Sequence, residues 1–241
     1  MIIQNGVQIS NGLIMGETAP LTSGLQLYLD ATSLSSYSGS GSTWYDLSGN
    51  GNNSTLVSSP TYTTIWPYYF AFNGSTQYAQ TVNTIPSSTT GFTLTAWIKK
   101  TGSTYAFLLV QPAAQATGFG FELYPTTAYI NCQTSSLSDY SEFSWNQTGW
   151  HEWTAVFDGS GVGNTGRLNV YVDGVNQSMT YTGTIGTTLL ASGANTFQIN
   201  RRPWTGTVGQ SDFISVLMYN RALSAEEVQI NYTRLRALYR L

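Results

Sequence analysis

The chain has 241 residues, of which 41% are hydrophobic and only 9% are charged. This hydrophobic content excludes a disordered tail, and the length suits one large all-β domain that buries its core without disulfide staples. The formal net charge of -3 and the lack of any basic run argue against a nucleic-acid partner.

Cysteine content and hydropathy limit the cellular setting. Cys132 is the only cysteine, so an intramolecular disulfide is excluded, and we expect this residue to be a small buried or half-buried strand residue. No stretch approaches the roughly 18 apolar residues of a membrane span, and the first residues do not resemble a signal peptide. We expect no membrane partner and a place in a virion or, alternatively, outside the cell or on its surface by a non-classical route.

Residues 1–22 differ in pattern from the rest of the chain. Asn5-Gly6 and Asn11-Gly12 recur six residues apart between short apolar stretches, and Asn-Gly favours tight turns with positive φ. The pattern predicts short extended pieces. They form either an arm that pairs with a partner's sheet edge or with other copies, or an N-terminal strand that folds back on the same domain.

From residue 25 onward the sequence alternates apolar and polar residues. LQLYLDA (25–31) and FTLTAWIKK (92–100) have the period of two that is typical of half-buried strands. The same pattern continues in FGFELYP (119–125), AYINCQT (128–134), HEWTAVFDG (151–159), RLNVYVDGVNQ (167–177), TFQINRR (196–202) and DFISVLMYN (212–220). Asp173-Gly174 predicts a hairpin turn. Many short strands without intervening helices indicate a sandwich or barrel.

One helix is predicted near the C-terminus. Ser224 precedes Glu227 by three residues, which makes a capping box. Apolar residues then follow at helical spacing as Val228, Tyr232, Leu235 and Leu238. We expect this helix to pack against the sandwich or against a neighbouring subunit.

An ordered set of segments resembles a known family. Residues 24–56, with WYDLSGNGN (44–52) at their centre, resemble the opening of laminin-G-like, concanavalin-type jelly-roll domains of phage virion and microbial surface proteins. FAFNGSTQYAQT (70–81) resembles the second element, and FISVLMYNRALSAEEV (213–228) resembles the closing strand and helix. The resemblance covers roughly residues 24–233. It implies two facing antiparallel sheets in jelly-roll order, binding of glycans or proteins at loop edges or on the concave sheet, and in some relatives a calcium ion.

Together these observations predict an all-β, two-sheet antiparallel jelly-roll sandwich with a short C-terminal helix and an extended N-terminal arm. We assign residues 1–22 to the arm and residues 23–241 to the jelly-roll domain.

The sequence lacks the pattern of the catalytic relatives. Concanavalin-like glucanases carry Glu-x-Asp-x-x-Glu on one strand, where alternation brings both carboxylates to one face. Here Glu122, Glu142 and Glu152 each lack an Asp two residues later, and His151 and Glu152 should point to opposite faces. We therefore predict a protein without enzymatic activity.

Oxygen-rich residues indicate a structural calcium site. Asp46, Asn50 and Asn52 share one loop, and Asn73 and Asp212 belong to elements that resemble neighbours of that loop in the family. The alternative is that Asp46 and the nearby Asn and Gly residues only hold a tight turn. If calcium is bound, EDTA should lower the melting temperature.

Tryptophans divide into two groups by their surroundings. Trp44, Trp97 and Trp153 lie in strand-like motifs and should be packing residues. Trp66, Trp145 and Trp204 lie among Pro, Gly or Asn and look like loop residues that could stack on a sugar. Trp204, beside Arg201 and Arg202, is the best ligand-binding candidate; a role in capping the core is its alternative.

We expect a virion or surface structural protein that decorates a capsid or fibre and carries a glycan- or protein-binding module. Its expected partners are capsid or other virion proteins, itself through the arm, and cell-surface glycans. The alternatives are a free-standing carbohydrate-binding module or lectin and, third, a glucanase-type hydrolase.

Overall fold

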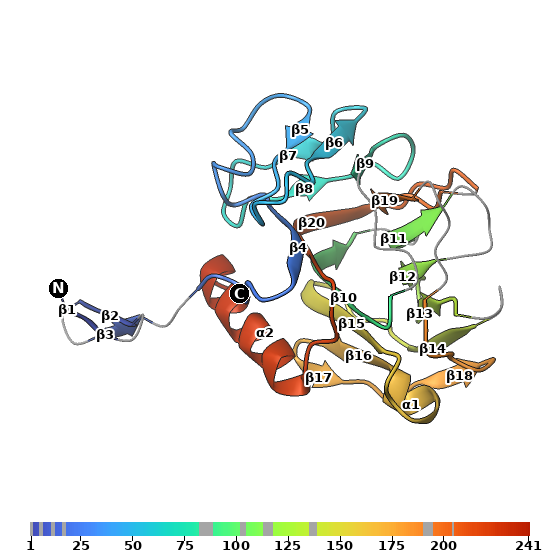
Figure 1. The fold of residues 1–241 in the computed structure, drawn as a ribbon. Coiled ribbons are helices and arrows are strands. Elements are labelled where there is room, and N and C mark those ends of the chain that lie inside the picture. Colours follow the sequence, from blue (N-terminus) through green and yellow to red (C-terminus); the bar gives the residue numbers. More distant parts are fainter. Residues whose placement is uncertain are drawn as a thin grey trace.

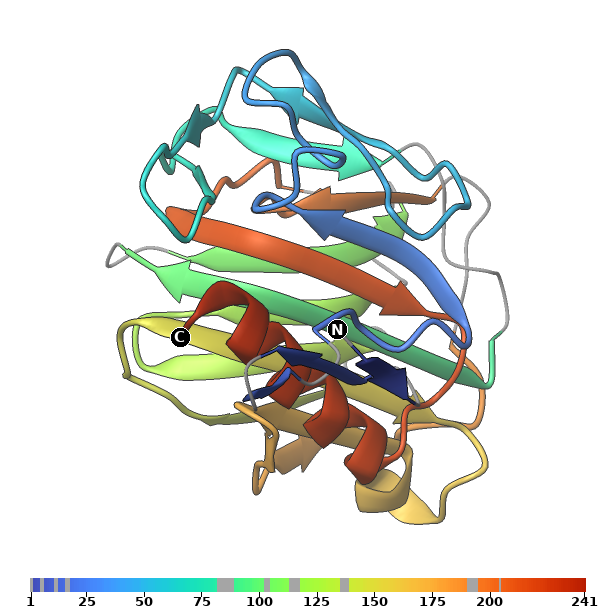
Figure 2. The same cartoon turned by 90° about the vertical axis from the view of Figure 1, so that its left-hand side faces the viewer.

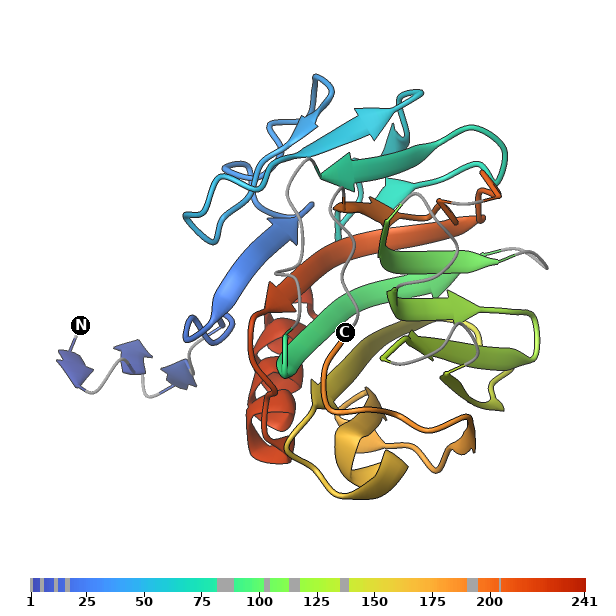
Figure 3. The ribbon, with the colours of Figure 1, turned by 45° about the vertical axis from the view of Figure 1, so that its right-hand side comes forward.

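The computed structural model describes residues 2–4, 7–10, 13–15, 18–81, 89–101, 105–112, 118–134, 139–189, 195–203 and 205–241. Two large antiparallel sheets face each other and enclose the core (Figure 3). This arrangement confirms the predicted two-sheet jelly-roll sandwich.

One sheet has eight strands, and we call it the helix-side sheet. Its order is β17 (Val175–Asn176), β16 (Leu168–Val172), β15 (Trp150–Asp158), β10 (Gly91–Lys100), β20 (Ser211–Tyr219), β8 (Phe70–Ala71) and β7 (Thr61–Tyr62), with β4 (Leu25–Asp30) also paired to β20. β4 and β8 share one edge of β20, because β8 pairs with Asp212 and Phe213 while β4 pairs with residues 215–219.

The opposite sheet has nine strands, and we call it the open sheet. Its order is β18 (Thr180–Thr182), β14 (Tyr140–Ser144), β13 (Thr127–Cys132), β12 (Phe119–Leu123), β11 (Ala106–Pro112), β19 (Asn195–Ile199), β9 (Tyr78–Thr81), β6 (Ser54–Val57) and β5 (Thr43–Trp44).

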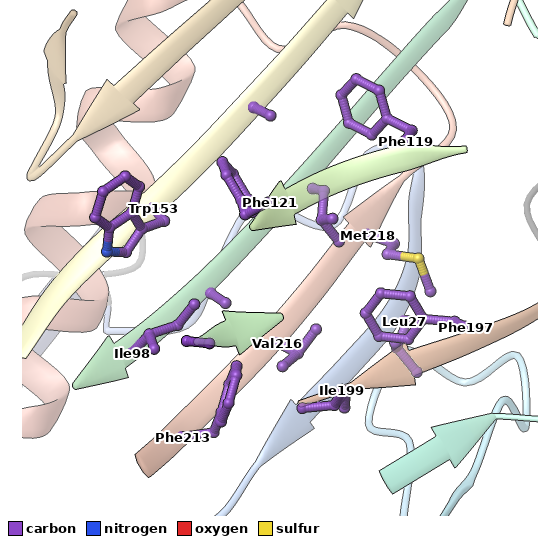
Figure 4. Packing of buried hydrophobic residues seen from close by; sticks show 14 of the residues in the cluster. Leu27, Ile98, Phe119, Phe121, Trp153, Phe197, Ile199, Phe213, Val216 and Met218 are labelled. Carbon is purple, nitrogen blue, oxygen red and sulfur yellow. The ribbon is translucent and has the colours of Figure 1, made fainter. Parts of the chain in front are cut away.

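The core lies between the two sheets and consists of the inward residues of both (Figure 4). Trp153 from the helix-side sheet meets Phe121 from the open sheet, with ring centroids 6.0 Å apart, and Phe213 and Phe197 are buried in the same cluster. Cys132 is also buried there, as predicted. Alternation along the open-sheet strands therefore leaves every second residue of those strands on its outer face.

The C-terminal helix α2 (Ala225–Tyr239) lies across the outer face of the helix-side sheet (Figure 2). Its capping box is confirmed, since Ser224 Oγ accepts from the Glu227 amide at 3.2 Å and the Glu227 carboxylate accepts from the Ser224 amide at 2.9 Å. The helix covers a second apolar cluster that includes Trp97, Leu217 and Tyr219.

Burial beneath α2 contradicts one prediction about the strands. Alternation predicted that the strands at 25–31 and 92–100 are half-buried, but β4, β10 and β20 are buried on nearly their whole length. The reason is that α2 covers the face that a bare sandwich would expose to water. Trp97 is accordingly a packing residue, as predicted, but it packs beneath the helix and not between the sheets.

Smaller elements complete the fold. Asp173 and Gly174 both have positive φ and join β16 to β17, which confirms the predicted hairpin. A one-turn helix, α1 (Gly163–Arg167), was not predicted. Among the described residues, no helix has the length and apolar character needed to span a bilayer.

The N-terminal residues form a small sheet of their own. β1 (Ile2–Gln4), β2 (Val7–Ser10) and β3 (Leu13–Met15) pair with one another and stand apart from the sandwich (Figures 1 and 3). The turns predicted at Asn5-Gly6 and Asn11-Gly12 lie outside the described residues.

The end of the segment assigned to the arm is attached to the body. The Leu21 amide donates to Asn231 Oδ1 on α2 at 2.9 Å, and the Ala19 carbonyl accepts from Arg234 at 3.3 Å. Tyr219 donates its hydroxyl to the Leu21 carbonyl at 3.0 Å. Residues 19–22 therefore belong structurally with the helix and the helix-side sheet.

Candidate functional site

Polar and aromatic side chains collect on the outer face of the open sheet. Phe121, Ile130 and Phe143 pack into or against the core, so their neighbours along β12, β13 and β14 point outward. The register then places Glu122 opposite Tyr129, and Tyr129 opposite Glu142. Glu122, Tyr129 and Glu142 thus lie side by side on three neighbouring strands.

Four tyrosines extend along this face in edge-to-face contact, and we call them the tyrosine row. The ring centroids of Tyr105 and Tyr124 are 4.6 Å apart, those of Tyr124 and Tyr129 are 4.9 Å apart, and those of Tyr129 and Tyr140 are 5.7 Å apart. All four side chains are half-buried. Such contacts fix the ring orientations, so the row is a rigid surface with apolar edges and polar hydroxyl groups.

A buried ion pair anchors one end of the tyrosine row. Arg202 forms an ion pair with Glu122, whose side chain is only 6% exposed. Glu122 also accepts hydrogen bonds from Tyr124 Oη at 3.1 Å and from Asn131 Nδ2 at 3.0 Å. Burial alone would lower the pKa of Arg202, but the hydrogen bond and charge of Glu122 outweigh it and raise that pKa.

The opposite end of the row carries a second carboxylate. Glu142 faces Tyr129 across the β13–β14 pair. The hydrogen bond to Glu142, with a smaller contribution from burial, raises the pKa of Tyr129 above its usual value. Hydroxyl, carboxylate, amide and guanidinium groups therefore lie together around a row of aromatic rings.

Arg201 and Arg202, both predicted from sequence as ligand-binding residues, border different parts of this face. Arg201 stacks over the Tyr78 ring at 4.8 Å and donates to Gln198 Oε1 at 3.3 Å. It therefore borders the β9 and β19 side, whereas Arg202 borders β12. Trp204, the leading aromatic candidate, lies outside the described residues.

Trp66 and Trp145 are not part of this face, so the predicted set of five ligand-binding residues does not form one site. Trp145 is half-buried and packs against Trp153 and His151, with ring centroids 5.0 Å away in each case. Trp66 is 37% exposed and donates Nε1 to the Tyr239 carbonyl at 3.1 Å. Trp66 therefore lies at the C-terminal end of α2.

The predicted metal ligands divide into two groups. Asp46 accepts from the Tyr28 and Ser48 amides through Oδ1 and from the Asn52 amide through Oδ2, each at 2.9 Å. Asn50 and Asn52 donate their side-chain amides to β4 carbonyls. These bonds are those of the alternative interpretation, in which the Asp46 loop is a tight turn fastened to β4.

Asn73 and Asp212 form the other group. Both line a cavity of about 340 Å³ near the start of β20, and Asp212 forms an ion pair with Lys99 at 2.8 Å. Asp46 is bonded to Tyr28 of β4, which pairs with Leu217 near the end of β20, whereas Asp212 lies at the start of β20. The five residues therefore do not converge on one ion. The described residues contain no group of three or more His, Cys, Asp or Glu side chains suited to a metal ion. Calcium binding stays a prediction.

The remaining acid–base groups are separated from the tyrosine row. His151 Nδ1 lies 2.7 Å from Asp173 Oδ2, and this hydrogen bond raises the pKa of His151. Glu152 lies on the helix-side sheet beneath α2, paired with Trp97. Within the described part of the chain, His151 Nε2 forms no hydrogen bond to a serine, threonine or cysteine side chain that it could activate.

Sequence reasoning missed the tyrosine row and the role of Glu122. The residues of the tyrosine row are spread over positions 105–140, and only strand register brings them together. The available signal was the outward phase of the alternation in 119–125 and 128–134, which places Glu122, Tyr124 and Tyr129 on one face once the inward phenylalanine and isoleucine residues are identified.

A family model described as the concanavalin A-like lectin/glucanases superfamily matches residues 73–229. No curated protein matches the sequence. Several solved structures share the fold at low identity.

The binding domain of botulinum neurotoxin DC in complex with SialylT superposes with a TM-score of 0.63 at 10% identity, over 89% of this chain and 52% of that chain. The botulinum neurotoxin type G receptor binding domain gives 0.62 at 14% identity, over 88% and 51%. The neurotoxin DC binding domain in complex with rat synaptotagmin II gives 0.60 at 10% identity, over 88% and 52%. The chain therefore spans about half the length of these structures.

Proposed function

This chain belongs to the concanavalin A-like lectin/glucanases superfamily, and we propose that it is a non-catalytic module that binds glycans on the outer face of its open sheet. The observation that carries this proposal is the tyrosine row with the Glu122–Arg202 pair at its end. Sugars combine apolar ring faces with hydroxyl groups, and this surface offers partners for both.

The extent of the surface favours a chain of sugars over a single residue. Neighbouring strands lie about 4.8 Å apart, so Glu122, Tyr129 and Glu142 on β12, β13 and β14 extend over roughly 10 Å. Tyr105 lengthens this surface further. The similar neurotoxin binding domains include one in complex with SialylT and one in complex with synaptotagmin II. Their identity to this chain is too low to transfer either ligand, but binding is consistent with this fold.

The geometry of the carboxylates supports a module without catalytic activity. Glu122 and Glu142 are two strands apart, or roughly 10 Å, which exceeds the about 5 Å of a retaining glycosidase pair and lies at the upper limit of the roughly 6.5–9.5 Å of an inverting pair. The Glu122 carboxylate is bonded to Arg202, Tyr124 and Asn131. A general acid must be free to donate a proton to the substrate, and Glu122 is held by the protein itself.

The test is a glycan array, run with calcium and again with EDTA, on the wild type and on Tyr129→Ala. We expect Tyr129→Ala to weaken retention of the selected glycan about tenfold, the effect of losing roughly 1.4 kcal/mol of stacking, while the loss of its ring contacts with Tyr124 and Tyr140 lowers the melting temperature only slightly. Trp66→Ala is the matched control, since Trp66 lies at the end of α2. Equal retention by Tyr129→Ala and wild type would exclude the tyrosine row as the site.

A second role, assembly of a virion or surface structure, is favoured by the separate N-terminal sheet. β1–β3 pair only with one another in the described residues and stand apart from the body (Figure 1). A sheet this small needs an apolar face or a packing partner to be stable, and its edge strands can pair with other chains.

Removal of residues 1–17 tests this second role, because the bonds to the body begin at Ala19. We expect the shortened chain to keep its melting temperature and its glycan binding while its mass in light scattering falls to that of a monomer. An unchanged oligomeric state after the deletion would remove the support for assembly through the arm.

A further inference from the structure

Glu152 is a carboxyl group enclosed between the helix-side sheet and α2. The residue is 1% exposed, and neither carboxylate oxygen has a hydrogen-bond partner among the described residues. Buried carboxyl groups in folded proteins are normally paired or hydrogen-bonded, because an isolated charge away from water costs several kcal/mol. The proposed glycan site does not use this group.

The surroundings of Glu152 are apolar and aromatic. The strand register places it beside Trp97, whose indole Nε1 also lacks a partner among the described residues. From α2, Tyr232 stacks on the Trp97 ring at 5.9 Å and Tyr239 meets it edge-on at 5.7 Å. The helix therefore closes the space over Trp97 and Glu152 directly.

Among the residues that the structure describes, no cation forms an ion pair with this carboxyl group. The titratable or charged groups around it are Asp173 from the β16–β17 turn, Tyr219 from β20, Tyr232 and Arg236 from α2, and, further along the sheet, Tyr239, Tyr28 and Asp30. Arg236 is exposed and donates Nε to the Leu241 carbonyl, while Asp173 binds the Glu152 amide and His151. Asp173 adds negative charge near Glu152, which opposes its ionisation further.

We infer that Glu152 acts as a proton-dependent latch: α2 stays seated on the helix-side sheet while this carboxyl group is neutral, and ionisation of Glu152 loosens the helix. Loosening would uncover the apolar surface around Trp97, Leu217 and Tyr219. It would also break the two bonds from Asn231 and Arg234 by which α2 holds residues 19–22, and would leave the Leu21 carbonyl bonded to Tyr219 of β20. The latch thus links proton uptake to the base of the N-terminal arm.

The direction of the pH dependence follows from the burial. Burial, with a smaller contribution from Asp173, holds the pKa of Glu152 well above its usual range in the docked state. Undocking exposes the group and returns the pKa to about 4.3. The docked state therefore binds more protons, and its advantage is complete below pH of about 4.3 and is lost as the pH rises toward the raised pKa.

Hydrogen exchange on the full chain tests the latch. After correction for intrinsic exchange rates, the opening equilibrium of residues 228–239 should increase about tenfold per pH unit above pH of about 4.3, until the raised pKa is reached. The opening of β10 serves as the internal reference. In Glu152→Gln the opening of α2 should not change with pH, and at pH 8 it should be smaller than in the wild type.

Two further variants make the result decisive. Glu152→Leu replaces the carboxyl group with an apolar side chain and should show the same flat profile, which covers the case in which the amide of Gln disturbs folding. Glu142→Gln is the matched control, because it removes a carboxyl group from the open sheet, and it should keep the wild-type slope. A flat wild-type profile, or an equal slope in wild type and Glu152→Gln, would overturn the inference.

Discussion

Replacing Arg202 with methionine should lower the free energy of unfolding by about 3 kcal/mol, the lower end of the range for breaking a buried ion pair. The low end applies because 18% of the Arg202 side chain is exposed to solvent, compared with only 6% of the Glu122 side chain. Most of the loss comes from leaving the Glu122 carboxylate in the open sheet without its cation. Urea denaturation at neutral pH measures this change through its midpoint.

The loss has a physical cause. A carboxylate held away from water that has lost its cation costs several kcal/mol. A variant whose denaturation midpoint equals that of the wild type at pH 7 would contradict the structural importance of the pair.

A double variant separates the pair's contribution to stability from its contribution to binding. Glu122→Met combined with Arg202→Met removes both charges, and apolar replacement of a buried pair is often neutral. We therefore expect the double variant to be more stable than Arg202→Met alone. Glycan retention should stay low in both, because each lacks the charged end of the tyrosine row.

Local sequence signals predicted local structure well. The capping box at Ser224 and Glu227 is formed, and Asp173-Gly174 adopts the positive φ angles that a tight hairpin needs. These features depend on residues within four positions of one another, so composition and spacing determine them. The resemblance to concanavalin-type domains then supplied the sheet arrangement, which the family match and the fold confirm.

The sequence pattern did not predict which residues of different strands lie opposite one another. The carboxylates of Glu122 and Glu142 belong to different strands, and only the pairing of each strand with β13 places Tyr129 between them. The same applies to Asp46 and Asp212, which the family pattern grouped together and which lie toward opposite ends of the β4–β20 region. Alternation identifies the face of a residue but not its neighbours across the sheet.

The sequence pattern also did not show which element covers each face of a sheet. Nothing in the alternation of β10 distinguishes a face covered by a helix from one covered by water. Trp97 and Glu152 both read as residues of a half-exposed strand, and α2, more than 70 positions later in the chain, buries them. This is why Glu152 drew attention in the sequence only as a possible catalytic carboxylate.

Replacing Trp153 with alanine should cost about 3–5 kcal/mol, as is typical when a fully buried tryptophan is truncated. Trp153 is 2% exposed on β15, and it contacts Phe121 of β12, Phe143 of β14 and Trp145, with ring centroids 6.0, 6.0 and 5.0 Å away. It thus joins the helix-side sheet to the strands of the open sheet. The cavity that alanine leaves cannot be filled by backbone movement in a closely packed core.

The loss should reach the outer face of the open sheet as well. β12 and β14 carry Glu122 and Glu142 outward from the positions next to Phe121 and Phe143, so a shift of either inner ring moves the polar groups around Tyr129. Trp153→Ala should therefore reduce both the urea midpoint and glycan retention. Trp66→Ala, at a site 37% exposed, should cost less than about 1 kcal/mol. Equal midpoints for the two variants would show that Trp153 does not join the sheets.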